Sequence, residues 1–122
     1  MDWNFRNDQP IYSQLTQRLT EAIVSGIYAP GEKLPSVREL AVEAGVNPNT
    51  VQRALAGLER DGLVFSQRTA GRFVTGDVSM IENAKLRLAD QCVENFLSEM
   101  AKLGCGRDEV IALLQGRKEE ES

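Results

Sequence analysis

Histidine is absent from the 122 residues, and cysteine occurs only twice, as Cys92 and Cys105. The commonest general base and the commonest nitrogen ligand of zinc are therefore missing. The two cysteines form no C-x-x-C pair, so a structural zinc site is not expected. The chain also lacks a P-loop and the G-x-S-x-G, G-x-G-x-x-G and H-E-x-x-H patterns. We expect no enzymatic activity, no metal and no cofactor.

Long hydrophobic segments are also missing. No apolar run approaches the roughly 18–20 residues that span a bilayer, and the N-terminus has neither the basic nor the apolar part of a signal peptide. With 42% hydrophobic and 26% charged residues, the composition is that of a soluble globular protein. We expect a cytoplasmic protein with reduced thiols and no membrane partner.

The net charge of −4 is distributed unevenly along the chain. Residues 1–76 carry eight basic and eight acidic side chains, whereas residues 77–122 carry six basic and ten acidic ones. A nucleic acid responds to the local field of one face rather than to the total charge. The overall acidity therefore does not exclude a nucleic-acid partner for the first part of the chain.

Two consecutive helices can be placed from capping chemistry in the middle of the chain. Ser36 and Glu39 match the S-x-x-E capping box, and Gly45 suits the left-handed end of the helix that follows. Asn47 can cap a second helix at once, with Pro48 at its first position. Two helices joined by so short a turn predict a helix-turn-helix motif.

A third helix is predicted before this motif. Apolar residues recur every four positions between Ile11 and Ile27, which indicates a one-sided amphipathic helix. Pro10 suits its first turn, and Asn7 or Asp8 is the expected cap.

A hairpin is predicted after the motif, because the β-prone runs 63–65 and 72–75 are separated by residues 66–71, which can turn the chain. Residues 33–35 are expected to be a short extended link. Three helices and a hairpin make a winged helix-turn-helix domain over residues 1–76.

Residues 77–122 differ in kind and predict a helical hairpin. Another S-x-x-E pattern, Ser79 to Glu82, is expected to start its first helix. Gly104 and Gly106 should separate this helix from a second, shorter one at 108–115. Apolar residues at alternating spacings of three and four favour pairing with another chain. The predicted dimerisation residues are Leu86, Ala89, Val93, Phe96, Met100 and Leu103. The expected fold class is mainly α (α+β), a winged helix-turn-helix domain followed by a helical dimerisation tail.

The second helix of the motif has the polarity of a recognition helix. At 100° per residue, Val51 and Leu55 lie on the buried side, while Asn49 and Arg53 lie nearly opposite and Gln52 on the flank. Asn, Gln and Arg are the side chains that pair with base edges in the major groove. The alternative is that the polar residues only cap the helix and meet solvent. The candidate DNA contacts from the residues themselves are Arg38, Asn47, Thr50, Gln52 and Arg53, with Arg68, Thr69, Gly71 and Arg72 in the wing.

Several motifs in a fixed order resemble the GntR family of transcription regulators. They are P-G-E-K-L-P-S-V-R-E-L-A at 30–41, G-V-N-P-N-T-V-Q-R-A-L-A-G-L-E at 45–59, D-G-L-V at 61–64 and G-R-F-V at 71–74. The short tail is similar to that of the YtrA-type subfamily, which has no large effector domain and dimerises through its C-terminal helices. The resemblance implies DNA contacts by Arg38, Asn47, Asn49, Thr50, Gln52 and Gly71. The chain departs from the family pattern in two places. Pro48 occupies a position that is often basic in the family, and the wing sequence is R-T-A-G-R-F.

The expected function is that of a transcriptional regulator, a repressor, which binds a pseudo-palindromic double-stranded DNA operator as a homodimer. The helix at 47–60 would enter the major groove, and the protein would be cytoplasmic and associated with the nucleoid. Two alternatives stay open: a winged-helix module for protein interaction, and a thiol redox switch. The switch would use Cys105, which we expect to be the more exposed and reactive cysteine, whereas Cys92 should be buried. The residues identify no small-molecule effector.

Overall fold

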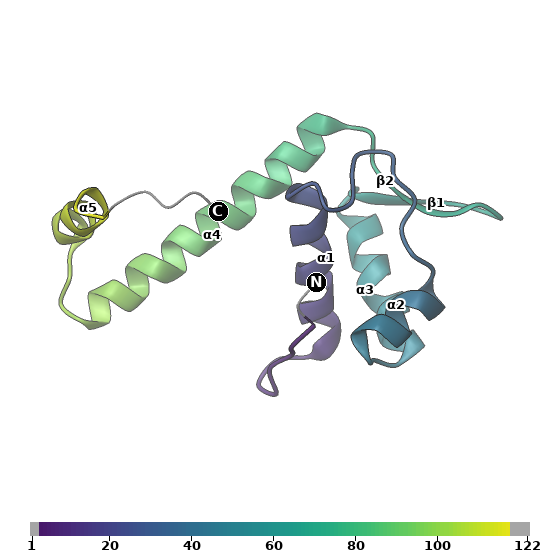
Figure 1. The fold of residues 1–122 in the computed structure, drawn as a ribbon, viewed down its shortest axis with the longest axis horizontal. Coiled ribbons are helices and arrows are strands. Elements are labelled where there is room, and N and C mark those ends of the chain that lie inside the picture. The colour runs from purple at the N-terminus through teal and green to yellow at the C-terminus, as the bar shows by residue number, and fades with distance from the viewer. Residues whose placement is uncertain (1–2, 118–122) are drawn as a thin grey trace. The chain divides into compact units, whose positions relative to one another are not determined.

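The computed structural model describes residues 3–117, which form five helices and a two-stranded antiparallel sheet (Figure 1). The elements are α1 (Ile11–Val24), α2 (Val37–Ala44), α3 (Pro48–Arg60), β1 (Val64–Gln67), β2 (Gly71–Val74), α4 (Val78–Lys102) and α5 (Arg107–Gln115). The chain divides after Lys85 into two compact units, here called the winged-helix unit and the tail unit. Helix α4 contributes its first two turns to the former and the rest to the latter.

The predicted helix-turn-helix is confirmed in its capping details. The Ser36 hydroxyl accepts from the Glu39 N–H at 3.1 Å, and the Glu39 carboxylate accepts from the Ser36 N–H at 3.0 Å. Helix α2 ends at Gly45, whose φ of +68° is one that glycine adopts without a steric penalty. Asn47 then caps α3 by accepting from the Asn49 N–H at 2.7 Å.

Helix α1 forms as predicted, but the expectation of a cap at Asn7 or Asp8 is wrong. The N-cap residue is Pro10, and no side chain caps the helix. The preceding arm is instead held by the buried side chain of Gln14. Its amide oxygen accepts from the Arg6 N–H at 2.7 Å, and its amide nitrogen donates to the Arg6 carbonyl at 2.8 Å. The arm thereby folds back over the start of α1.

The turn of the wing is shorter than predicted, and a third segment of the chain joins its sheet. Strands β1 and β2 pair from Val64 with Val74 to Gln67 with Gly71, so only residues 68–70 form the turn. The extended link before α2 also joins the sheet, because Lys33 pairs with Phe73 in an antiparallel bridge. The Leu34 N–H donates to the Arg72 carbonyl at 2.9 Å. Strand β2 is therefore held on both edges.

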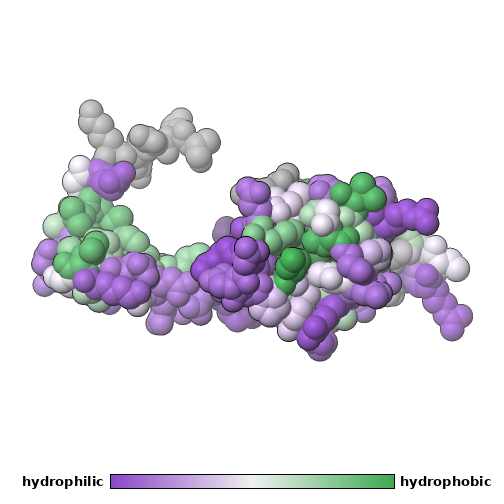
Figure 2. Space-filling view, turned by 90° about the horizontal axis from the view of Figure 1, so that it is seen from below, coloured by the Kyte–Doolittle hydropathy of each residue, from purple (hydrophilic) through white to green (hydrophobic). Residues whose placement is uncertain are grey.

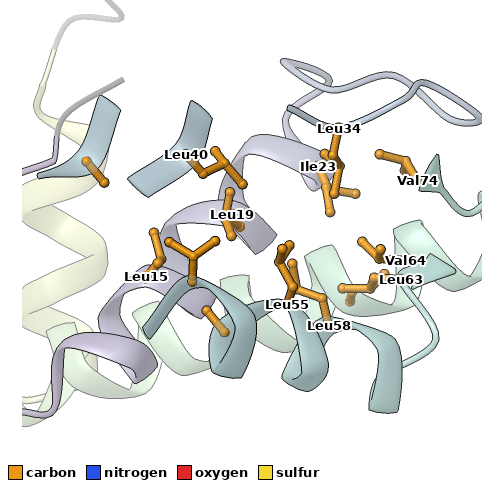
Figure 3. Close-up of a cluster of buried hydrophobic side chains, with 14 of the residues drawn as sticks. Leu15, Leu19, Ile23, Leu34, Leu40, Leu55, Leu58, Leu63, Val64 and Val74 are labelled. Carbon is orange, nitrogen blue, oxygen red and sulfur yellow. The ribbon is translucent and has the colours of Figure 1, made fainter. Parts of the chain in front are cut away.

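One hydrophobic core fills the winged-helix unit (Figure 3). Leu15 and Leu19 of α1 meet Leu55 and Leu58 of α3, and all four are almost completely buried. Leu34, Leu40, Leu63, Val64 and Val74 extend this core from the link, α2 and the wing.

The start of α4 also belongs to this core, through Ile81 and Ala84. The compact unit therefore continues past the hairpin, which ends at Val74, as far as Lys85. The predicted capping box at Ser79 and Glu82 is wrong, because Ser79 already lies inside α4. The carboxylate of Asp77 accepts from the Met80 N–H at 3.3 Å instead.

The tail unit contains the rest of α4 and the short helix α5, separated around Gly104 and Gly106 as predicted. Its packing differs from that of the winged-helix unit, because Val110 is its one buried apolar residue among those that the structure describes. Apolar side chains lie at the surface of this unit (Figure 2). The large ones that are exposed are Leu86, Val93, Phe96, Leu103, Ile111, Leu113 and Leu114. Within residues 3–117, no helix is long and apolar enough to cross a membrane.

The two cysteines are placed opposite to expectation. Cys92 is exposed, whereas Cys105 is half-buried. Burial raises the pKa of the Cys105 thiol, and the neighbouring Glu109 carboxylate raises it further. The thiolate is the reactive form of cysteine, so this environment disfavours reaction at Cys105.

Candidate nucleic-acid interface

Helix α3 separates its side chains into a buried face and an exposed face. Val51 and Leu55 point into the core, while Asn49, Gln52 and Arg53 are exposed. The exposed residues lie in the N-terminal half of the helix, the part that reaches base edges when a recognition helix enters a major groove. The predicted polarity of this helix is therefore confirmed.

Arg53 is held in place by an aromatic ring from α1. Its guanidinium carbon lies 3.6 Å from the centroid of the Tyr12 ring, a cation–π contact. Tyr12 and Arg53 line a shallow hollow together with Asn49 and Thr50. The hollow thus combines an arginine, two polar side chains and the positive end of the α3 dipole, a combination that suits a phosphate group.

Arg72 of the wing is bonded to α3. Its Nε donates to the Glu59 carboxylate at 2.8 Å, and its Nη2 donates to the Gln52 amide oxygen at 3.0 Å. The Ser66 hydroxyl donates to the same Glu59 oxygen at 2.8 Å. The hydrogen bonds from Arg72 and Ser66 lower the pKa of the Glu59 carboxyl, so the charged pair is maintained at neutral pH.

The side chains of Arg38, Arg68 and Thr69 are exposed and make no hydrogen bond or ion pair within residues 3–117. Arg38 lies in the first turn of α2, whereas Arg68 and Thr69 lie at the tip of the wing. The structure thus brings Gln52 and Arg72 together and leaves these three side chains free to meet a partner.

Gly71 stands where a larger residue would be strained. Its φ is +112°, and a Cβ built there would lie 3.0 Å from Cε of Lys33. Lys33 therefore passes close to the base of the wing turn and adds a positive charge beside Gly71.

Three residues of this surface escaped the sequence-based prediction: Tyr12, Lys33 and Glu59. Glu59 lies two helical turns after Gln52, so its spacing carried a usable signal. Tyr12 and Lys33 reach the site only through tertiary packing, and the sequence near them carried no such signal.

Among the described residues, no group of three histidine, cysteine, aspartate or glutamate side chains could hold a metal ion. The site instead consists of arginines, amides and hydroxyls on a recognition helix and a wing. Fold and site together define a DNA-binding winged helix-turn-helix protein of the transcriptional-regulator class.

Comparison with known proteins gives the family. Residues 11–74 match the family described as bacterial regulatory proteins, gntR family. The chain belongs to this GntR family.

One similar structure covers the tail as well, and another similar structure was solved together with an operator. A GntR family transcriptional regulator from Listeria monocytogenes superimposes with a TM-score of 0.85 at 41% identity, over 93% of this chain and 100% of that one. The HTH-type transcriptional repressor YtrA of Bacillus subtilis is 44% identical over 85 residues, which cover 70% of this chain and 61% of YtrA. The DNA-binding domain of AraR, solved in complex with operator ORE1, has a TM-score of 0.54 and 27% identity over 62% of this chain and 94% of that one.

Proposed function

We propose that the protein is a repressor that binds a pseudo-palindromic operator as a homodimer, with α3 of each protomer in a major groove. The observation that carries this proposal is the exposed face of α3, which presents Asn49, Gln52 and Arg53 opposite a completely buried face. Side chains of these three types hydrogen-bond to base edges in the major groove. The operator complex of AraR and the repressor name of YtrA support the proposal.

The remaining candidate residues have positioning roles in this proposal. Asn47 and Thr50 lie at the start of α3, where backbone N–H groups suit a phosphate. Arg38 and Arg68, both without partners in the described part of the chain, would neutralise phosphates on either side. Thr69 and Gly71 keep the wing tip small enough to approach a minor groove.

Dimerisation is assigned to the tail unit in this proposal. Leu86, Val93 and Phe96 lie on α4 at spacings of seven and three, and each has two-fifths or more of its surface exposed. Ala89, Met100 and Leu103 continue the same stripe. A second copy that packs on this stripe would set the spacing of the half-sites at about one helical turn of DNA. A regulator of this kind would act in the cytoplasm, on the nucleoid.

Selection of bound sequences from random double-stranded DNA tests the proposal. We expect a two-fold symmetric sequence, with an affinity that falls steeply as salt rises, because phosphate contacts release counterions. Arg53→Ala should weaken binding strongly, whereas Arg107→Ala, an exposed arginine on α5, is the charge-matched control. Failure of the wild type to retain any DNA at low salt would contradict the proposal.

The two alternatives predict other results. A protein-interaction module would retain DNA equally poorly with or without Arg53 and Arg68. A redox switch at Cys105 would lose its response to oxidant in Cys105→Ser while DNA binding persists. The raised pKa of the Cys105 thiol disfavours the reactive thiolate, which speaks against this switch. We propose no class of small-molecule effector.

A further inference from the structure

The amide of Gln52 is already engaged at one end. Its oxygen accepts from Arg72 Nη2 at 3.0 Å, across the gap between α3 and the wing. A guanidinium has only donors, so the end of the amide that faces it must be the acceptor oxygen. The Nε2 amino group, with two donor hydrogens, is therefore the end of Gln52 that remains for a ligand.

Arg72 is anchored well enough to hold this orientation. Its Nε forms an ion pair with Glu59 at 2.8 Å, and about two-thirds or more of each of the two side chains is shielded from solvent. The Ser66 hydroxyl bonds to the same carboxylate oxygen at 2.8 Å. The backbone of Arg72 is also fixed, because its carbonyl accepts from the Leu34 N–H. The bond to Gln52 therefore costs little additional side-chain entropy.

Glutamine with both ends free reads adenine, because its oxygen accepts from N6 and its nitrogen donates to N7. Arg72 takes one lone pair of the Gln52 oxygen and holds that end of the amide toward the wing, so the end that is left free is the amino group, which only donates. Guanine presents two acceptors, O6 and N7, in the major groove, and thymine presents O4. Cytosine presents only an amino group there and cannot accept, whereas adenine can accept at N7 but leaves its N6 amino group facing a donor, so both are disfavoured relative to guanine and thymine.

We propose that Gln52 reads the operator as a hydrogen-bond donor only and selects guanine or thymine, with Arg72 as the positioning residue that sets this polarity. The inference rests on the proposed function, since it names the base class that one residue of that DNA site recognises. It also assigns Glu59 a role, because the carboxylate holds Arg72 in place.

Selection from random DNA with four forms of the full chain tests the polarity. The wild type should show guanine or thymine at the position that Gln52 contacts. Gln52→Glu keeps an acceptor for Arg72 and presents a second acceptor to the DNA, so the preference at that position should change to cytosine or adenine. Arg72→Met frees the Gln52 oxygen, so adenine should become acceptable there. The expected change in relative affinity is about three- to ten-fold, as for one hydrogen bond.

Arg68→Met is the matched control, because Arg68 lies in the same wing and bonds to neither Gln52 nor Glu59. It should lower affinity for all sequences alike. Thermal melting checks the folding of each variant. If Arg72→Met does not fold, Glu59→Gln, which loosens the anchor without removing Arg72, should change the preference in the same direction by a smaller factor.

The outcomes separate this inference from the proposed function. A wild type that selects no sequence contradicts the function and the inference together. A wild type that selects a sequence while Gln52→Glu changes no position overturns the inference alone. A wild-type preference for adenine at the position that Gln52→Glu alters overturns it as well.

Discussion

The two units of this protein treat their apolar side chains in opposite ways. In the winged-helix unit, Leu19 and Leu58 are completely buried in a core made of residues from the same chain. In the tail unit, Phe96 is 43% exposed and Leu103 is 76% exposed. Burial of a leucine or phenylalanine side chain contributes about 1.5–3 kcal/mol, so the tail leaves much of this stabilisation unused in a single chain. The first unit therefore buries a hydrophobic core of its own, whereas the second leaves most of its large apolar side chains at the surface.

The units also differ in how their surface side chains are held. In the winged-helix unit, Tyr12 and Glu59 hold the arginines of the candidate DNA site from other elements. The surface contacts of the tail within residues 86–117 are short-range, such as the ion pair of Lys102 with Glu99 on one helix. Such pairs contribute a few tenths of a kcal/mol and fix no side chain for a partner. A preordered surface suits the reading of DNA, whereas an apolar surface suits association.

The largest expected effect comes from the core of the winged-helix unit. Leu58→Ala removes a completely buried side chain and should lower the free energy of unfolding by about 2–5 kcal/mol. Denaturant unfolding measures this change. Ile27→Ala, at a side chain that is 60% exposed, is the control and should change stability by no more than about 0.5 kcal/mol. If Leu58→Ala and Ile27→Ala lowered the free energy of unfolding equally, the predicted contrast between buried and exposed side chains would be wrong.

The next prediction tests the partner of the tail. Phe96→Asp places a charge in the exposed apolar stripe and should give a monomer in sedimentation at concentrations where the wild type is a dimer. The winged-helix unit should keep its melting behaviour, because Phe96 lies outside its core.

Val42→Asp is the matched control for this change, since Val42 is a 77% exposed apolar residue of α2. It should leave the dimer intact. A chain that ends at Lys85 retains Ile81 and Ala84 and should be a folded monomer. If either Phe96→Asp or the chain that ends at Lys85 is a dimer, the dimer interface lies elsewhere than predicted, outside the tail.

A smaller effect is expected from acid, through the ion pair between Glu59 and Arg72. The folded state lowers the pKa of Glu59 below its ordinary value of 4.5. The pair therefore stabilises the protein at pH values above about 4.5, and this contribution is lost as the pH falls through the lowered pKa. Wild type should be more stable than Glu59→Gln at neutral pH, and the difference should disappear in acid.

Denaturant unfolding at a series of pH values measures this difference. The matched control is Glu82→Gln, which breaks no hydrogen bond in the described part of the chain. A difference between wild type and Glu59→Gln that grows toward acid would contradict the assigned sign.

The smallest effect concerns the aromatic support of Arg53. Tyr12→Leu removes the ring under the guanidinium, and the loss of about 0.5–1 kcal/mol should weaken DNA binding roughly two- to five-fold. Tyr12→Phe keeps the ring and should bind as the wild type does. Fluorescence anisotropy with a labelled operator measures both. Equal losses in the two variants would assign the effect to the hydroxyl group rather than to the cation–π contact.

Local rules predicted most of the fold from residues close in sequence. Ser36 and Glu39 are three positions apart, and Asn47 and Pro48 are adjacent, so their capping bonds depend on few other residues. The same rules failed where two local signals competed. Asp77 and Ser79 can both cap a helix, and Asp77 does so because Ile81 and Ala84 must turn toward the core. Pro10 starts α1 without a capping side chain, because Gln14 already binds the arm before it.

The sequence by itself determined the helix-turn-helix, the wing and the polar face of α3, because each depends on caps, turns or periodicity within about a dozen residues. Only the tertiary structure decided which of these side chains meet. Arg72 reaches Gln52 and Glu59 because the wing folds back on α3, and Arg53 reaches Tyr12 because α1 packs on the same helix. Such pairs are far apart in the chain, and their contact depends on how the shared core fills rather than on any local pattern.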